Sequence, residues 1–187
     1  MSQSQIQDFF RELSTLSLEC SSLAPLISEA SKIIQNSLSK GNCIFTAGNG
    51  GSAAEAMHMS AEFTGRYKKE RSGLRSVCLN CDISALTAIS NDYSYEQVFS
   101  RQLEALSKEG DILILFSTSG NSPNLISLAK AAKTKKVKVI SLLGKGGGKI
   151  APLSDLSIIV PSQNTPRIQE IHQLIMHSIC ETIDNSK

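Results

Sequence analysis

The spacing of hydrophobic positions along this chain changes at about residue 40. Over residues 3–38 the apolar side chains recur every three or four positions, which is the spacing of one helix face. They include Ile6, Phe9, Phe10, Leu13, Leu16, Leu23, Leu26, Ile27, Ile33 and Ile34. Pro25 lacks the amide hydrogen that a helix interior needs, so we expect it to break or bend this segment into two helices. Residues 1–40 are therefore predicted to form a helical N-terminal segment.

Short apolar runs then alternate with segments long enough to form helices. The runs predict strands over residues 43–46, 76–79, 112–116, 137–142 and 156–160, and the segments between or after them predict helices over residues 52–67, 95–108, 122–134 and 166–183. Strands and helices in this order form a parallel sheet with helices on both faces. We expect an α/β fold, one domain of 187 residues whose residues 41–187 form a five-stranded parallel sheet flanked by helices.

Composition and charge limit the kinds of partner that this chain is expected to bind. The net charge is +2, there is no Trp, and hydrophobic residues make up 41% of the chain, so no nucleic-acid partner is expected. No apolar stretch reaches the length of a membrane span, and the first residues lack the apolar core of a signal peptide. We expect a cytoplasmic protein with no membrane partner.

Two of the five cysteines, Cys78 and Cys81, have C-x-x-C spacing. A zinc knuckle needs a second pair, which the sequence lacks. Cys78 ends a predicted strand and does not begin a helix, as a redox cysteine of this motif would. The cysteines are therefore predicted to be reduced and packed.

A hydroxyl-rich turn, Ser-Thr-Ser-Gly-Asn-Ser over residues 117–122, joins a predicted buried strand to a predicted helix. Ser122 is expected to be the N-cap of that helix and Pro123 its first residue. Free N–H groups at a helix start, together with hydroxyls, suit a phosphate group. No Gly-x-x-x-x-Gly-Lys-Ser/Thr loop is present, so the turn is more typical of a sugar phosphate than of a nucleotide.

A second turn, Gly-Asn-Gly-Gly-Ser over residues 48–52, follows the first predicted strand. Its glycines permit positive φ and close approach of a ligand, although a plain strand-to-helix turn has the same composition. Ser52 and Glu55 have the spacing of a capping box. Both turns are expected at the carboxyl ends of parallel strands, where ligands bind in open sheets of this kind.

Polar residues on the predicted helices offer candidate chemistry. His58 and Glu62 are four apart and face the same way, so they could share a metal ion, act as an acid–base pair, or simply lie on a solvated helix face. Gln169 and His177 are separated by ~12 Å of helix rise, so a site shared between subunits would bring them together more easily. His172 is interpreted as a capping or surface residue.

Several of these motifs resemble those of the SIS (sugar isomerase) domain family, and more narrowly those of the bacterial phosphoheptose isomerases. The stretches that carry the resemblance are AGNGGS (47–52), AMH (56–58) with Glu62, TGRY (64–67), Asn91-Asp92, STSGNS (117–122) and RIQEIH (167–172) with His177. Without the resemblance, Asn91 and Asp92 would be interpreted as a turn.

The resemblance implies a role for each matched position. Ser117, Thr118, Ser119 and Ser122 would hold the phosphate, and Asn49, Gly50, Gly51, Asn91 and Asp92, with Glu62 and Gln169, would contact the sugar. His58, Glu62, Gln169 and His177 would bind one zinc ion per active site. Glu62 would be the base and His177 the partner acid. The family is tetrameric with its sites at subunit contacts, so a homotetramer is expected.

The implied reaction converts D-sedoheptulose 7-phosphate to D-glycero-D-manno-heptose 7-phosphate through an enediol. Some proteins of the same fold, including a regulator that associates with a replication initiator, keep the loops but lack the catalytic carboxylate and histidine. A different class of the same fold would bind sugar phosphate without turnover. This chain has both Glu62 and His177, which favours an enzyme.

Overall fold

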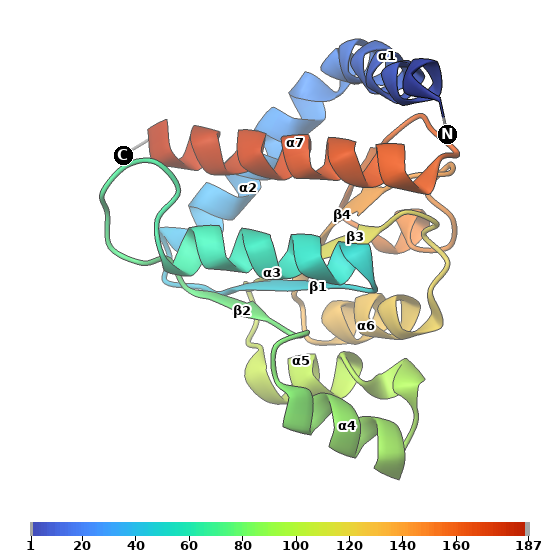
Figure 1. Cartoon of the computed structure of the whole chain (residues 1–187). Helices are drawn as coiled ribbons and strands as arrows, with labels where there is room; N and C mark the ends of the chain where they lie inside the picture. The colour runs from blue at the N-terminus through green and yellow to red at the C-terminus, as the bar shows by residue number, and fades with distance from the viewer. Residues whose placement is uncertain (1, 186–187) are drawn as a thin grey trace.

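The computed structural model describes residues 2–185. Its centre is a parallel sheet of five strands in the order β2-β1-β3-β4-β5 (Figure 1). The strands are β1 (Ile44–Gly48), β2 (Ser76–Cys78), β3 (Ile112–Ser117), β4 (Lys138–Leu143) and β5 (Leu156–Ile159). The five-stranded parallel sheet predicted from the apolar runs is confirmed.

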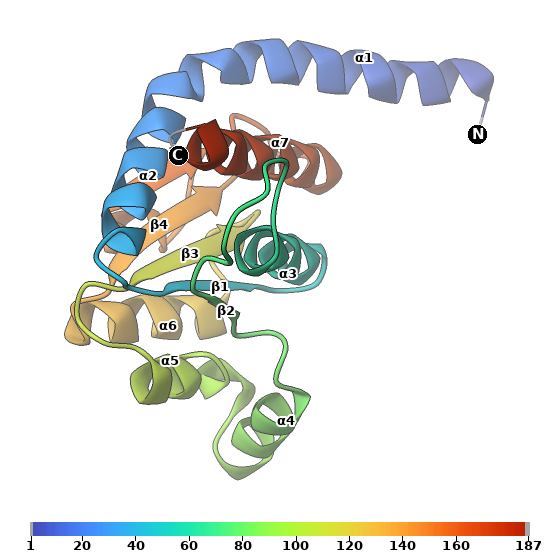
Figure 2. The same ribbon diagram turned by 90° about the vertical axis from the view of Figure 1, so that its left-hand side faces the viewer.

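Helices cover both faces of this sheet (Figures 1 and 2). One face carries α2 (Ala24–Leu38), α3 (Gly51–Thr64) and α7 (Thr165–Asn185), and the other carries α5 (Ser100–Leu106) and α6 (Pro123–Thr134), with α4 (Ile83–Asp92) beyond them. Because both faces are covered, every residue of β1 and β3 is buried.

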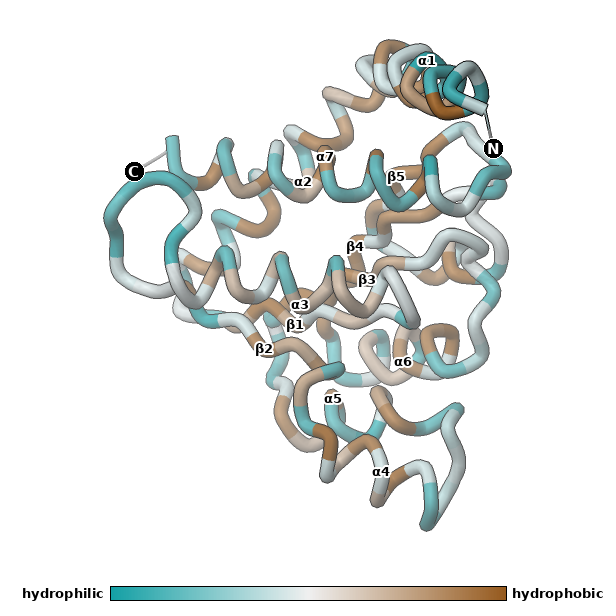
Figure 3. Tube along the Cα trace, viewed as in Figure 1, coloured by the Kyte–Doolittle hydropathy of each residue, from teal (hydrophilic) through white to brown (hydrophobic). Residues whose placement is uncertain are grey.

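Alternate side chains of the central strands enter two separate hydrophobic cores. In β3, Ile112, Ile114 and Phe116 pack on the side of α2, α3 and α7, whereas Leu113 and Leu115 pack on the side of α5 and α6. In Figure 3 the central strands are coloured as hydrophobic, whereas the loop that follows α3 is largely hydrophilic. The first of these cores joins α3 and α7, which carry the candidate histidines and Glu62.

The N-terminal segment consists of α1 (Gln3–Glu19), a 3₁₀ turn (Cys20–Leu23) and α2, so the predicted division into two helices is confirmed. Pro25 lies in the first turn of α2, where its missing N–H has no intrahelical partner to lose. The break therefore precedes the proline. Helix α1 extends over the start of α7 (Figure 2), where Arg167 donates a hydrogen bond to the carbonyl of Phe9 at 2.8 Å. Phe10 is 73% exposed.

The region between β2 and β3 differs from the prediction. Helix α4 was not predicted, and the helix expected over residues 95–108 is a 3₁₀ turn (Tyr95–Gln97) followed by the short α5. No side chain of α4 is fully buried, although Ile83, Leu86 and Ile89 recur every three residues, and Leu86 and Ile89 pack partly against the core. Its start is set locally, because the Asp82 side chain accepts a hydrogen bond from the N–H of Ala85 at 2.9 Å. Among the described residues, no helix combines the length and apolarity needed to cross a bilayer.

Candidate active site

The two predicted turns lie side by side at one edge of the sheet. β1 pairs with β2 on one side and with β3 on the other, and the turn after β1 and the turn after β3 both begin at carboxyl ends. β1 and β3 are the neighbouring strands at which the strand order reverses, and ligands of open parallel sheets bind at the carboxyl ends of such strands. The prediction that both turns share this edge is confirmed.

The shape of the hydroxyl-rich turn depends on Gly120 and on hydrogen bonds within the turn. Gly120 has φ +63°, and a Cβ there would collide with the carbonyl oxygen of Gly147. The N–H of Gly120 donates to Ser117 Oγ at 3.1 Å, and the N–H of Asn121 donates to Ser119 Oγ at 3.2 Å. Both hydroxyls are acceptors in these bonds, so each can still donate its proton to a ligand oxygen. Ser122 is the N-cap of α6 as predicted, and its side chain makes no capping hydrogen bond.

The turn after β1 is tied to the same region. Asn49 exchanges two hydrogen bonds of 2.9 Å with Asn124 in the first turn of α6. Gly50 has φ +57° and is the N-cap of α3, with no side-chain capping bond. The predicted capping box of Ser52 and Glu55 is therefore wrong: the helix begins one residue earlier, and Glu55 is buried at 5% exposure instead of capping the helix end.

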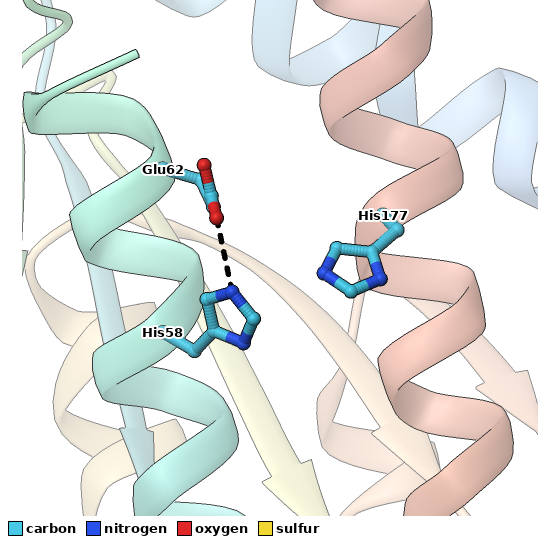
Figure 4. A group of neighbouring side chains, drawn as sticks. All are labelled: His58, Glu62 and His177. Carbon is cyan, nitrogen blue, oxygen red and sulfur yellow. Dashed lines mark hydrogen bonds and ion pairs between the residues drawn. The ribbon is translucent and has the colours of Figure 1, made fainter. Parts of the chain in front are cut away.

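Helices α3 and α7 bring His58, Glu62 and His177 together (Figure 4). One ligand atom from each lies within 4.8 Å of the other two, and all three side chains are half-buried. His58 Nε2 is 2.9 Å from Glu62 Oε1, and the rings of His58 and His177 are edge-to-face at 5.1 Å between centroids. The ring of Tyr67 also stacks on His177, with ring centroids 5.7 Å apart. Two imidazoles and a carboxylate at this separation are a fitting donor set for a transition metal.

The protonation of His177 suits that arrangement. Burial lowers the pKa of His177, and the neighbouring His58 lowers that pKa further. A lower pKa means that the ring is neutral near pH 7, which is the form that binds a metal or donates a neutral N–H to a carbonyl oxygen.

Gln169, the fourth metal ligand that the resemblance implies, lies nearer the start of α3. Gln169 lies against Gly51 at the start of α3. It shares a cavity of about 310 Å³ with His58, and the other residues that line this cavity are Gly51, Ala54, Glu55, Glu170 and Gln173. Its predicted part in binding the metal stays a prediction.

Asn91 and Asp92 occupy the last turn of α4, which lies on the opposite face of the sheet from α3 and α7 (Figure 1). Their interpretation as a turn is therefore wrong. Both are exposed, and Asn91 Nδ2 donates to Asp92 Oδ1 at 2.9 Å. Within one chain they do not join the His58 group, and a contact with the sugar stays a prediction.

His172 is fully buried, so its interpretation as a capping or surface residue is wrong. Its Nε2 lies 3.1 Å from the carbonyl oxygen of Leu143, to which it donates. Its Nδ1 is 3.7 Å from Glu55 Oε2, and neither Glu55 oxygen has a hydrogen-bond partner in the described structure. The sequence held a signal for this burial, because His172 follows Ile168 by four residues on the apolar face of α7.

Gln173 was also missed from the sequence. Its amide nitrogen is 2.8 Å from Nδ1 of His58, and its Oε1 is buried without a hydrogen-bond partner. No motif pointed to it, because the contact joins positions 115 residues apart.

An ion pair fastens the two helices near the His58 group. Arg71 Nε donates to Asp184 Oδ1 at 2.9 Å, and the two side chains are 8% and 2% exposed. The Arg71 guanidinium also donates to the carbonyl of Glu62 at 2.7 Å. This network links the end of α3 to the end of α7, and thereby contributes to the spacing between Glu62 and His177.

The cysteines follow the prediction with one exception. Cys78 is buried, and burial raises its pKa to about 11, which disfavours the reactive thiolate. Cys81 is exposed, so the prediction that it is packed is wrong. All five cysteines are free thiols in this structure.

Comparison with known proteins identifies the family. The SIS domain model matches residues 8–144. The phosphoheptose isomerase of Aliarcobacter butzleri is 49% identical over 185 residues, which cover 99% of this chain and 98% of that protein. The phosphoheptose isomerase of Helicobacter pylori strain 26695 is 47% identical over 178 residues, 95% of this chain and 93% of the relative.

Solved structures agree with these relatives. A phosphoheptose isomerase from Neisseria gonorrhoeae superposes with a TM-score of 0.93 at 41% identity, covering 98% of both chains. One from Francisella tularensis superposes with a TM-score of 0.96 at 34% identity, covering 99% of both. This chain therefore belongs to the SIS domain family and, within it, to the phosphoheptose isomerases.

Proposed function

We propose that this chain converts D-sedoheptulose 7-phosphate to D-glycero-D-manno-heptose 7-phosphate, the first step in making a nucleotide-activated heptose. It is an aldose–ketose isomerase of heptose phosphate, like the relatives that it matches over nearly its whole length. The observation that carries the mechanism is the convergence of Glu62 and His177 from two helices.

The reaction moves one proton between neighbouring carbons. Glu62 transfers the proton at the carbon atoms, and His177 transfers protons at the oxygen atoms. The Glu62 carboxylate removes a proton from C1 while His177 gives its N–H proton to the C2 oxygen, which forms the enediol. Glu62 then returns its proton to C2, and His177 takes the proton from the C1 hydroxyl as the aldehyde forms. A neutral imidazole can act in this way, and the lowered pKa of His177 keeps it neutral.

Zinc is the metal that we propose for this site. His58, Glu62 and His177 would hold it, with Gln169 as a fourth ligand. Bound there, zinc would supply Lewis-acid polarisation of the substrate carbonyl. A carboxylate bound to zinc is a weaker base, so Glu62 would serve either as a metal ligand or as the base at any one time.

The phosphate is proposed to bind at the hydroxyl-rich turn, through Ser117, Thr118, Ser119 and Ser122. Asn49, Gly50 and Gly51 would line the sugar beside it. These residues are neutral, so they supply hydrogen bonds without fixing the phosphate by an ion pair.

The distance along α3 supports a site shared between subunits. Glu62 follows Gly51 by eleven residues, which corresponds to a rise of roughly 16 Å. That is more than a heptose 7-phosphate spans from its phosphate to C1, so the hydroxyl-rich turn of one chain is poorly placed to serve its own Glu62. We therefore propose a homotetramer in which the turn of one subunit and the α3–α7 group of another meet at a subunit contact.

Incubation of purified protein with sedoheptulose 7-phosphate tests the function directly. Formation of the aldose phosphate is followed with zinc added and with a chelator added. We expect product with zinc present. Absence of product under both conditions would contradict the isomerase assignment and favour a protein that binds sugar phosphate without turnover.

A further inference from the structure

Both ring nitrogens of His58 have a partner. Nε2 faces Glu62 Oε1 at 2.9 Å, and Nδ1 faces the amide nitrogen of Gln173 at 2.8 Å. The amide nitrogen can only donate, so Nδ1 must accept and the ring proton must lie on Nε2, directed at Glu62. In this tautomer Nε2 has no lone pair to offer a metal ion between His58, Glu62 and His177.

Rotation of the Gln173 side-chain amide can reverse which partner donates in its hydrogen bond with His58. Its Oε1 is buried and has no hydrogen-bond partner among the described residues. Half a turn about the last side-chain bond exchanges Oε1 and Nε2, because the two ends of an amide have nearly the same shape. The oxygen would then accept a hydrogen bond from Nδ1–H of His58, and the Nε2 lone pair would face Glu62 and His177.

We propose that Gln173 is a positioning residue that sets the tautomer of His58, donating to Nδ1 when the metal is absent and accepting from Nδ1–H when it is bound. Gln173 touches the ligand and not the metal. Hydrogen bonds of this kind fix the ring orientation of a metal-binding histidine and raise metal affinity. The inference rests on the proposed metal site.

A pair of substitutions separates this role from simple packing. Gln173→Glu offers only acceptor oxygens when ionised, so it supports the metal-binding tautomer. Gln173→Leu keeps much of the volume and offers no hydrogen bond. Gln7→Leu makes the same change at an exposed position on α1 and is the matched control.

The measurement is the zinc affinity of metal-free protein, determined by competition with a chromophoric chelator. We expect Gln173→Leu to weaken zinc binding about 10-fold or more, Gln173→Glu to bind at least as tightly as wild type, and Gln7→Leu to leave affinity unchanged. Nitrogen-15 NMR of the zinc-loaded wild type should show the His58 proton on Nδ1. This NMR result and the zinc affinity of Gln173→Glu together test the inference even if the leucine variant fails to fold.

Three results would overturn it: wild-type zinc affinity in a folded Gln173→Leu protein, Gln173→Glu binding zinc more weakly than Gln173→Leu, or a wild type that binds no zinc. Isomerase activity of the wild type is measured separately. An active wild type whose zinc affinity does not depend on position 173 refutes this inference alone, whereas an inactive wild type with the predicted affinities refutes the proposed function alone.

Discussion

Asp184→Asn tests whether the buried ion pair secures α3 to α7. Asp184 is 2% exposed and accepts three hydrogen bonds. These come from Arg71 Nε at 2.9 Å and from the N–H groups of Lys68 at 2.9 Å and Lys69 at 3.1 Å. Arg71 donates in addition to the carbonyls of Glu62 and Phe63 at the end of α3. The substitution preserves the shape of the side chain and removes its charge.

The expected loss of stability is large because the Arg71 guanidinium stays buried without a counter-charge. Removing one member of a buried ion pair costs about 3–5 kcal/mol. For a chain of this length each kcal/mol shifts the melting temperature by roughly 2–4 °C, so a decrease of about 6–20 °C is expected.

The pH dependence gives a second signature of the same pair. Burial alone would raise the pKa of Asp184, but hydrogen bonds from Arg71, Lys68 and Lys69 and the charge of Arg71 lower it to about 2, from an ordinary value of 3.8. Because the folded-state pKa is the lower one, the stabilisation is complete above the ordinary value and is lost as pH falls from about 4 towards 2. The difference in stability between wild type and Asp184→Asn should therefore shrink over that interval.

Thermal and urea unfolding, followed by circular dichroism at one fixed protein concentration, measures both effects. Glu109→Gln is the matched control, because it removes the charge from an exposed pair with Lys136 and should cost no more than about 1 kcal/mol. A destabilisation below about 1 kcal/mol at pH 7, or a difference that does not change between pH 5 and pH 2, would refute the reasoning.

Two further predictions concern the phosphate turn and the assembly. Ser119→Ala removes a neutral hydrogen bond to phosphate worth about 1 kcal/mol, so KM should rise roughly 5-fold with kcat nearly unchanged in steady-state kinetics; wild-type KM in both Ser119→Ala and Ser122→Ala would mean that the turn is misassigned. Light scattering after gel filtration should give the mass of four 20.1 kDa chains, and an active monomer would contradict the shared site.

The sequence was sufficient to predict the sheet but not the short, largely exposed helix that follows β2. The apolar runs of β1, β3 and β4 are long and buried on both sides, so their signal is strong. Helix α4 has no fully buried side chain, and no helix was predicted there. The start of α3 was misplaced because Ser52 and Glu55 fit a capping box by spacing, whereas Gly50, with φ +57°, occupies the cap itself.

Local sequence patterns likewise identified some residues of the candidate site and missed others. The spacing of His58 and Glu62 indicated a shared helix face, but only the resemblance to a known family grouped His177 with them. Packing of α7 against α3 then brings these three residues within reach of one another. The contact of Gln173 with His58 and that of Arg71 with Asp184 join positions more than a hundred residues apart, and no local pattern encodes such pairs.

The most direct test of the account is the turnover number of Glu62→Gln with sedoheptulose 7-phosphate at saturating zinc. Glutamine keeps the shape of the side chain and cannot take a proton from C1, so kcat should fall by at least ~100-fold. KM should change little, because the phosphate turn follows a different strand. Glu70→Gln removes a carboxylate whose side chain is 90% exposed, and it should be as active as wild type. A Glu62→Gln protein with near-normal kcat would contradict the assignment and leave His177 as the leading candidate for the base.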